Sequence, residues 1–96
     1  MAKGYWLTIY HSISDPSRLA QYAAVATPAI EKGGGRILAR GVATATFETD
    51  GNQRTTVIEF ESAQQAIETY KSAAYQEAAR ILKGAAVREV RIIEGV

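Results

Sequence analysis

The order in which two kinds of hydrophobic spacing alternate along the chain restricts the fold more than any other feature. Strand-like segments, rich in β-branched and aromatic residues, occupy residues 4–11, 36–49, 54–61 and 87–93. Apolar residues recur at helical spacing between the first and second of these segments, and again between the third and fourth. The sequence therefore predicts the order β-α-β-β-α-β. This is the ferredoxin-like arrangement, an α+β fold with an antiparallel sheet and helices on one face.

The first predicted helix has clear boundaries. Asp15 can accept hydrogen bonds as the N-cap, and Pro16 suits the first helical position because it lacks an N–H. Gly33–Gly35 should end the helix, since glycine adopts left-handed conformations without strain. We interpret these glycines as a helix stop, because a phosphate-binding loop follows a strand and precedes a helix. Pro28 predicts a kink or a restarted turn inside the helix.

Local signals also divide the second half of the chain. Asp50-Gly51 predicts a two-residue hairpin turn between the second and third strands. Residues 62–65 form a capping box at the start of the second helix. Ser72 can cap another helical segment, so we expect this helix to be broken in two and to end near Gly84.

Composition limits the classes of function. Ninety-six residues with 47% apolar content predict a single domain over residues 1–96. A net charge of +1 argues against a nucleic-acid or membrane partner. The chain has no cysteine and one histidine, so we expect no metal site and no cofactor, and a colourless purified protein. Its start lacks an apolar signal segment, and we expect it to be cytoplasmic.

Strand alternation predicts which residues share a face of the sheet, if Asp50-Gly51 is a two-residue turn. The face beneath the helices would carry Leu7, Ile9, Ile37, Ala39, Gly41, Ala43, Ala45, Phe47, Ile58 and Phe60. The opposite face would carry Trp6, Thr8, Tyr10, Leu38, Arg40, Val42, Thr44, Thr46, Val57 and Glu59. Such an apolar, aromatic face without a cover of helices predicts an interface. We therefore expect a homodimer through this face of the sheet.

Three polar residues are candidates for chemistry. Arg40 and Glu59 should be near neighbours on the uncovered face, where the arginine could bind an anion and the carboxylate could act as a general base. The alternative is a satisfied salt bridge in the dimer interface. His11 could act as a general acid or base near neutral pH, or could simply be a solvated residue at a strand end.

Aromatic residues supply a possible ligand pocket between the sheet and the helices. Its candidate walls are Tyr5, Trp6, Tyr10, Tyr22, Tyr70 and Tyr75, and ordinary core or interface packing is the alternative. Arg36 could contact an anion at the edge of the sheet. No residue set predicts a metal site.

Several short stretches together resemble a bacterial family known as domain of unknown function 1330. They are Gly4–Trp6, Gly34–Gly41, Val57–Phe60, Tyr70 with Ser72, Tyr75-Gln76, Ala85-Ala86 and Ile93–Gly95. The family often has proline where this chain has Glu61, and Pro-Glu where it has Ala73-Ala74, and both differences fall at helix starts. The resemblance implies the dimeric α+β barrel superfamily, in which two ferredoxin-like subunits pair through their sheets. It implies no reaction, because fold does not fix function.

Two functional hypotheses follow. In the first, the protein binds or transforms a small, partly apolar and anionic molecule in a pocket between sheet and helices. Arg40 would hold the anion, Glu59 or His11 would transfer protons, and the aromatic residues would enclose the substrate; within the superfamily, this would suit a cofactor-free monooxygenase or isomerase. In the second hypothesis, the protein is a non-catalytic homodimeric interaction module, with a structural or stress-related role.

Overall fold

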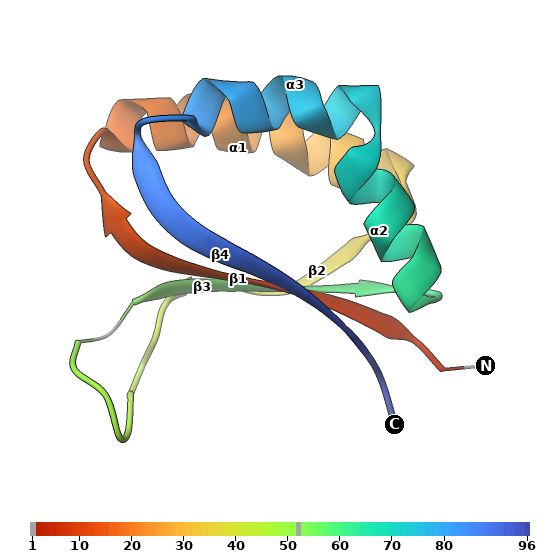
Figure 1. Cartoon of the computed structure of the whole chain (residues 1–96), viewed down its shortest axis with the longest axis horizontal. Helices are drawn as coiled ribbons and strands as arrows, with labels where there is room; N and C mark the ends of the chain where they lie inside the picture. The colour runs from red at the N-terminus through yellow and green to blue at the C-terminus, as the bar shows by residue number, and fades with distance from the viewer. Residues whose placement is uncertain (1, 52) are drawn as a thin grey trace.

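The computed structural model describes residues 2–51 and 53–96 and has the predicted ferredoxin-like fold. The elements are β1 (Gly4–Ile13), α1 (Pro16–Lys32), β2 (Arg36–Val42), β3 (Arg54–Phe60), α2 (Ala63–Lys71), α3 (Ala73–Leu82) and β4 (Ala86–Glu94). The four strands form an antiparallel sheet in the order β2-β3-β1-β4. All three helices lie on one side of this sheet, with α1 and α3 side by side (Figure 1). No helix in the described part of the chain is both long and apolar enough to span a membrane.

The predicted helix starts are confirmed. The Asp15 side chain accepts a hydrogen bond from the Arg18 amide, and Pro16 follows at the first helical position. Ser62 accepts from the Gln65 amide, and Ser72 accepts from the Tyr75 amide, where the second helix breaks into α2 and α3. These short polar side chains satisfy amides that have no partner within the helix.

The end of α1 is also where the glycines predict it. The helix continues through Pro28 without a break and ends at Lys32. Gly34 has a φ of +96°, which a side chain would disfavour. The preceding Gly33 carbonyl accepts a hydrogen bond from Gln65 Nε2 at 2.7 Å, which ties this turn to α2.

The predicted second strand is too long. β2 ends at Val42 and β3 begins at Arg54, so residues 43–51 and 53 form a loop instead of a tight hairpin, with Asn52 outside the described residues. Glu48 has a φ of +68°, which is incompatible with extended strand, and Phe47 is 83% exposed. The apolar side chains of residues 43–51 do not pack against the hydrophobic core. Alternation of apolar and polar residues was therefore not sufficient to form a strand here.

The prediction of the first strand's faces is wrong, because Trp6, Thr8 and Tyr10 lie beneath the helices. Trp6 pairs with Ile58 across the sheet and therefore shares its face, and it is only 1% exposed. The centre of its ring lies 4.8 Å from the ring centre of Tyr75 and 6.1 Å from that of Phe60. The indole N–H donates to Thr8 Oγ1 at 2.9 Å, so this large side chain is buried without an unpaired polar atom.

A bulge in β2 overturns the prediction for Arg40. Ile37 pairs with Ile58, but Ala39 pairs with Val57, so Leu38 is an extra residue and the alternation shifts there. Arg40 pairs with Thr56 and lies on the helix-facing side, while Ala39 lies on the other. Because one inserted residue reverses the faces of all that follow, every prediction for β2 beyond Leu38 was reversed.

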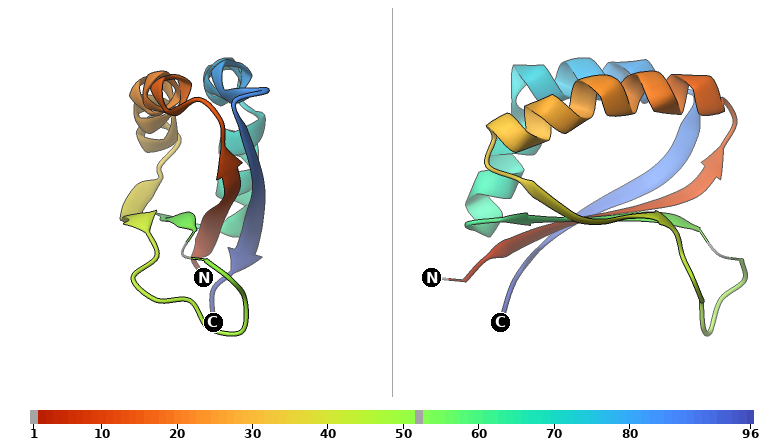
Figure 2. Two further views of the ribbon diagram at one scale, coloured as in Figure 1. Left: turned by 90° about the vertical axis from the view of Figure 1, so that its left-hand side faces the viewer. Right: turned by 180° about the vertical axis from the view of Figure 1, so that it is seen from behind.

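The uncovered face of the sheet, here called the outer face, is aliphatic instead of aromatic. Its central strands carry Leu7, Ile9 and Val57, all partly exposed. Ile93 and Val87 on β4 are more exposed. The view along the strands in Figure 2 shows that no helix of residues 2–51 or 53–96 covers this side.

Candidate functional site

A small cavity lies between α1 and the helix-facing side of the sheet. It has a volume of about 40 Å³, enough for a few water molecules. Its sheet-side lining includes Trp6, Thr8, Tyr10, Thr56 and Ile58, and α1 contributes Tyr22, Ala26 and Ile30 among others. The small side chain of Ala26 leaves space where a larger residue would fill the gap.

Two arginines line this cavity. Arg40 lies opposite Thr56 and Arg54 lies opposite Val42, so they are diagonal neighbours on one face of β2 and β3. Arg40 Nη1 donates to Thr27 Oγ1 on α1 at 3.2 Å. Within residues 2–51 and 53–96, neither guanidinium forms an ion pair with a carboxylate. The mouth of the cavity is therefore positively charged and the interior mostly apolar.

A wall of aromatic residues borders the cavity on the α3 side. The Tyr22 and Tyr75 hydroxyls lie 2.7 Å apart and are hydrogen-bonded. Arg88 donates to both hydroxyls, at 3.2 Å to Tyr22 and 2.9 Å to Tyr75. Burial, together with the neighbouring Tyr22, raises the pKa of Tyr75 far above 10. Burial also raises the pKa of Tyr10. The Tyr75 and Tyr10 phenols are therefore protonated at neutral pH. Tyr75 serves as a hydrogen-bonding group between Tyr22 and Arg88.

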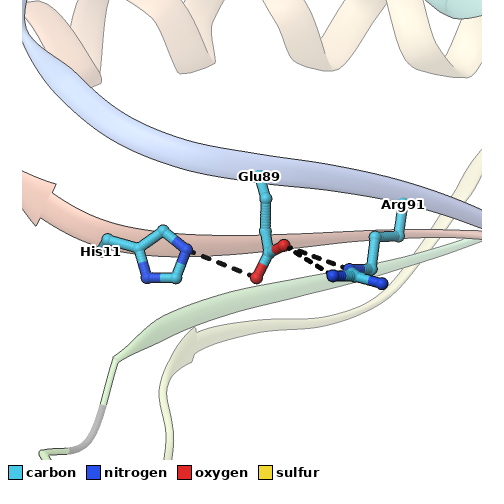
Figure 3. Close-up of polar contacts among 3 residues, drawn as sticks. All are labelled: His11, Glu89 and Arg91. Carbon is cyan, nitrogen blue, oxygen red and sulfur yellow. Dashed lines mark hydrogen bonds and ion pairs between the residues drawn. The ribbon is translucent and has the colours of Figure 1, made fainter.

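The two candidates for proton transfer lie on the outer face, away from the cavity. His11 Nε2 lies 3.3 Å from Glu89 Oε1, and Arg91 donates to Glu89 Oε2 from two nitrogens, as Figure 3 shows. Glu59 accepts a hydrogen bond from the Tyr5 hydroxyl at 3.1 Å. The expectation that Arg40 and Glu59 are neighbours is wrong, because the bulge at Leu38 puts them on opposite faces.

The remaining predicted residues divide between several places. Trp6 lines the cavity. Tyr75 packs against the Trp6 ring but does not line the cavity. Tyr70 packs against Trp6 and faces grooves beside β4. Arg36 is exposed and pairs with Glu59 in the sheet, so it belongs to the outer face.

Sequence reasoning missed Arg54 and the threonines of the cavity. A signal for Arg54 was present, because Arg54, Thr56, Ile58 and Phe60 alternate along β3. Once Ile58 and Phe60 are assigned to the helix-facing side, Arg54 must share it.

Comparison with known proteins places the chain in a family. The model of the family "Domain of unknown function (DUF1330)" matches residues 3–96, and the chain belongs to this family. No curated protein shows a significant match.

Solved structures share the fold at low sequence identity. A protein of unknown function from Rhodopseudomonas palustris is 15% identical with a TM-score of 0.77, over 99% of this chain and 83% of that one. A dimeric ferredoxin-like protein of unknown function from Thermobifida fusca is 10% identical with a TM-score of 0.66, over 97% and 91%. A Nitrosomonas europaea protein with the provisional name antibiotic biosynthesis monooxygenase is 13% identical with a TM-score of 0.63, over 96% and 98%. At these identities the likeness establishes the fold alone.

Proposed function

We propose that this protein binds a small, partly apolar anion between α1 and the sheet, with Arg40 and Arg54 contacting the charged group. The observation that carries the proposal is the placement of both guanidiniums at one apolar cavity without a carboxylate partner among the described residues. Two neighbouring cations repel each other, and an oxyanion bound between them relieves this repulsion and accepts charge-assisted hydrogen bonds.

The size of the cavity restricts the ligand. About 40 Å³ accommodates only a small apolar group. A larger ligand requires Arg40 or Arg54 to move, and Arg40 is exposed enough to do so. Short-chain carboxylates are therefore the first ligands to test.

The cavity supports binding more than proton transfer. Its lining includes no histidine and no carboxylate, and the tyrosine with a shifted pKa, Tyr10, is shifted upward. A general base therefore has no place at this site, in contrast to the role first considered for Glu59 and His11.

We also propose that two copies of the chain pair through the outer face, as a homodimer. Leu7, Ile9 and Val57 on the central strands give this face an aliphatic centre that no helix covers. Burial of each of these partly exposed side chains would stabilise a dimer by about 1 kcal/mol. The description of the Thermobifida fusca protein as dimeric supports the proposal by analogy.

Thermal unfolding with sodium acetate, propionate and butyrate tests the ligand proposal, with sodium chloride at equal ionic strength as the reference. A ligand that binds only the folded state raises the melting temperature, and saturation at about 100 times Kd stabilises by about 2.7 kcal/mol. We expect Arg40→Gln and Arg54→Gln each to weaken binding about tenfold, because each removes a charge-assisted hydrogen bond.

Arg36→Gln is the matched control, since it removes the same charge from the other face of the same sheet. It should leave the effect of the carboxylates unchanged. If the carboxylates raised the melting temperature of all three variants equally, the α1-side cavity would be rejected as the binding site. The absence of any carboxylate effect on the wild-type chain would instead favour the interaction-module hypothesis.

A further inference from the structure

Arg88 is a cation that the proposed α1-side site does not use. It lies on β4, facing the helices, and is half-buried. Its guanidinium carbon is 5.0 Å from the centre of the Tyr22 ring and 5.8 Å from that of Tyr10. Together with the Tyr22 and Tyr75 hydroxyls, these contacts hold the guanidinium in one place.

None of these contacts supplies a negative charge. The carboxylate adjacent in sequence is occupied elsewhere, since Glu89 contacts His11 and Arg91 on the outer face. Among the described residues, Arg88 forms no ion pair. A partly desolvated cation without a counter-charge is costly, and an anion from outside the chain would offset this cost.

Arg88 also has hydrogen-bonding capacity left. A guanidinium has five N–H donors. The hydrogen bonds from Arg88 to the two tyrosine hydroxyls use only some of these donors. The fixed position of the group resembles the pre-organised arginines that bind carboxylates and phosphates.

A groove beside β4 gives a ligand access to this arginine. It has a volume of about 380 Å³ between α3 and β4, and Gln76, Arg80, Lys83 and Arg88 are among its lining residues. A second hollow of about 340 Å³ shares Tyr70 and Arg88 with the first and adds Val90 and Ile92. Volumes of this size suit small molecules. The groove is basic at one end and apolar at the other.

We propose that this groove binds a carboxylate or phosphate group attached to a small apolar body. Arg88 and Lys83 contact the oxyanion, and Tyr70, Val90 and Ile92 contact the apolar body. The site is separate from the α1-side cavity, because the buried rings of Trp6, Tyr22 and Tyr75 stand between the two.

Amide NMR titration at constant ionic strength tests this proposal with phenyl phosphate, benzoate and inorganic phosphate as probes. We expect saturable shifts in the second half of α3 and along β4. Phenyl phosphate should bind at least about threefold more tightly than inorganic phosphate, because its ring buries apolar surface. Whichever of phenyl phosphate and benzoate binds with the higher affinity identifies the preferred oxyanion.

Two variants decide whether the groove is responsible. Lys83→Gln removes an exposed charge, and Arg88→Lys keeps the charge but loses the planar donors; each should weaken binding at least about fivefold. Arg91→Gln, on the outer face of the same strand, should leave the affinity unchanged. Shifts that grow linearly without saturation, or that persist in Lys83→Gln at full affinity, would overturn the proposal.

Discussion

The two faces of the sheet hold opposite combinations of charge and apolar surface. On the helix-facing side, Arg40, Arg54 and Arg88 stand beside aromatic residues and form no ion pair within the described chain. On the outer face, the carboxylates of Glu59 and Glu89 are hydrogen-bonded or paired, and the centre is aliphatic. Unpaired cations over aromatic walls are suited to anionic ligands, whereas paired charges around aliphatic residues are suited to another protein surface. We therefore propose that the same four strands offer a ligand-binding side and an association side.

Replacement of Trp6 by alanine should give the largest effect on stability. Trp6 is at the centre of the aromatic core on the helix-facing side, so Trp6→Ala should lose about 3–5 kcal/mol of unfolding free energy. Urea unfolding at two protein concentrations measures this loss and shows whether it depends on association. A loss below about 1 kcal/mol would mean that Trp6 is not in the core.

A charge at the centre of the outer face should break the proposed homodimer. Val57→Asp places a carboxylate among Leu7 and Ile9, and we expect the dissociation constant of the dimer to rise by at least about 100-fold. Sedimentation velocity measures the change. Val25→Asp on the exposed side of α1 is the matched control and should leave association unchanged. Equal sedimentation of both variants and the wild type would contradict the proposed interface.

Alkaline pH should separate the tyrosines of the two faces. The pKa of Tyr75 is raised by burial, so the folded state holds its proton more tightly than the unfolded state. The stabilisation is complete below the unfolded pKa of about 10 and is lost as the pH rises above it, by about 1.4 kcal/mol per pH unit.

Unfolding by urea between pH 9 and about pH 11 measures this slope. Tyr75→Phe should reduce the slope of unfolding free energy against pH by the amount that corresponds to about one proton. Tyr5→Phe on the outer face should change it less, because Tyr5 is only partly covered and its pKa is raised mainly by the hydrogen bond to Glu59. Identical slopes in the two variants would contradict the burial of Tyr75.

Local signals were sufficient to predict the order of the elements and the starts of the helices, but not the end of β2. The caps at Asp15, Ser62 and Ser72 act within one turn of helix, so neighbouring residues determine them. The order of strands and helices follows from periodicity, which also depends on nearby residues.

The faces of the strands could not be predicted in the same way. In β1, Trp6 and Tyr10 alternate with Leu7 and Ile9, so both sides are apolar, and only packing against Tyr75 and Phe60 selects the aromatic one. In β2, the bulge at Leu38 reverses the alternation without a local sequence signal. The candidate site changed accordingly: Arg40 and Trp6 lie together beneath the helices, where Arg54 joins them. Glu59 stays on the uncovered face, as predicted, and His11 lies there too.

The fluorescence of Trp6 in the dissociated chain tests this division of the sheet most directly, because Trp6 is the only tryptophan. If Trp6 belongs to the helix-facing core, the Val57→Asp monomer should keep the blue-shifted emission of the wild type and its protection from iodide quenching. A red shift and new quenching on dissociation, in a chain that is still folded, would put Trp6 at the association surface and contradict the assignment of the two faces.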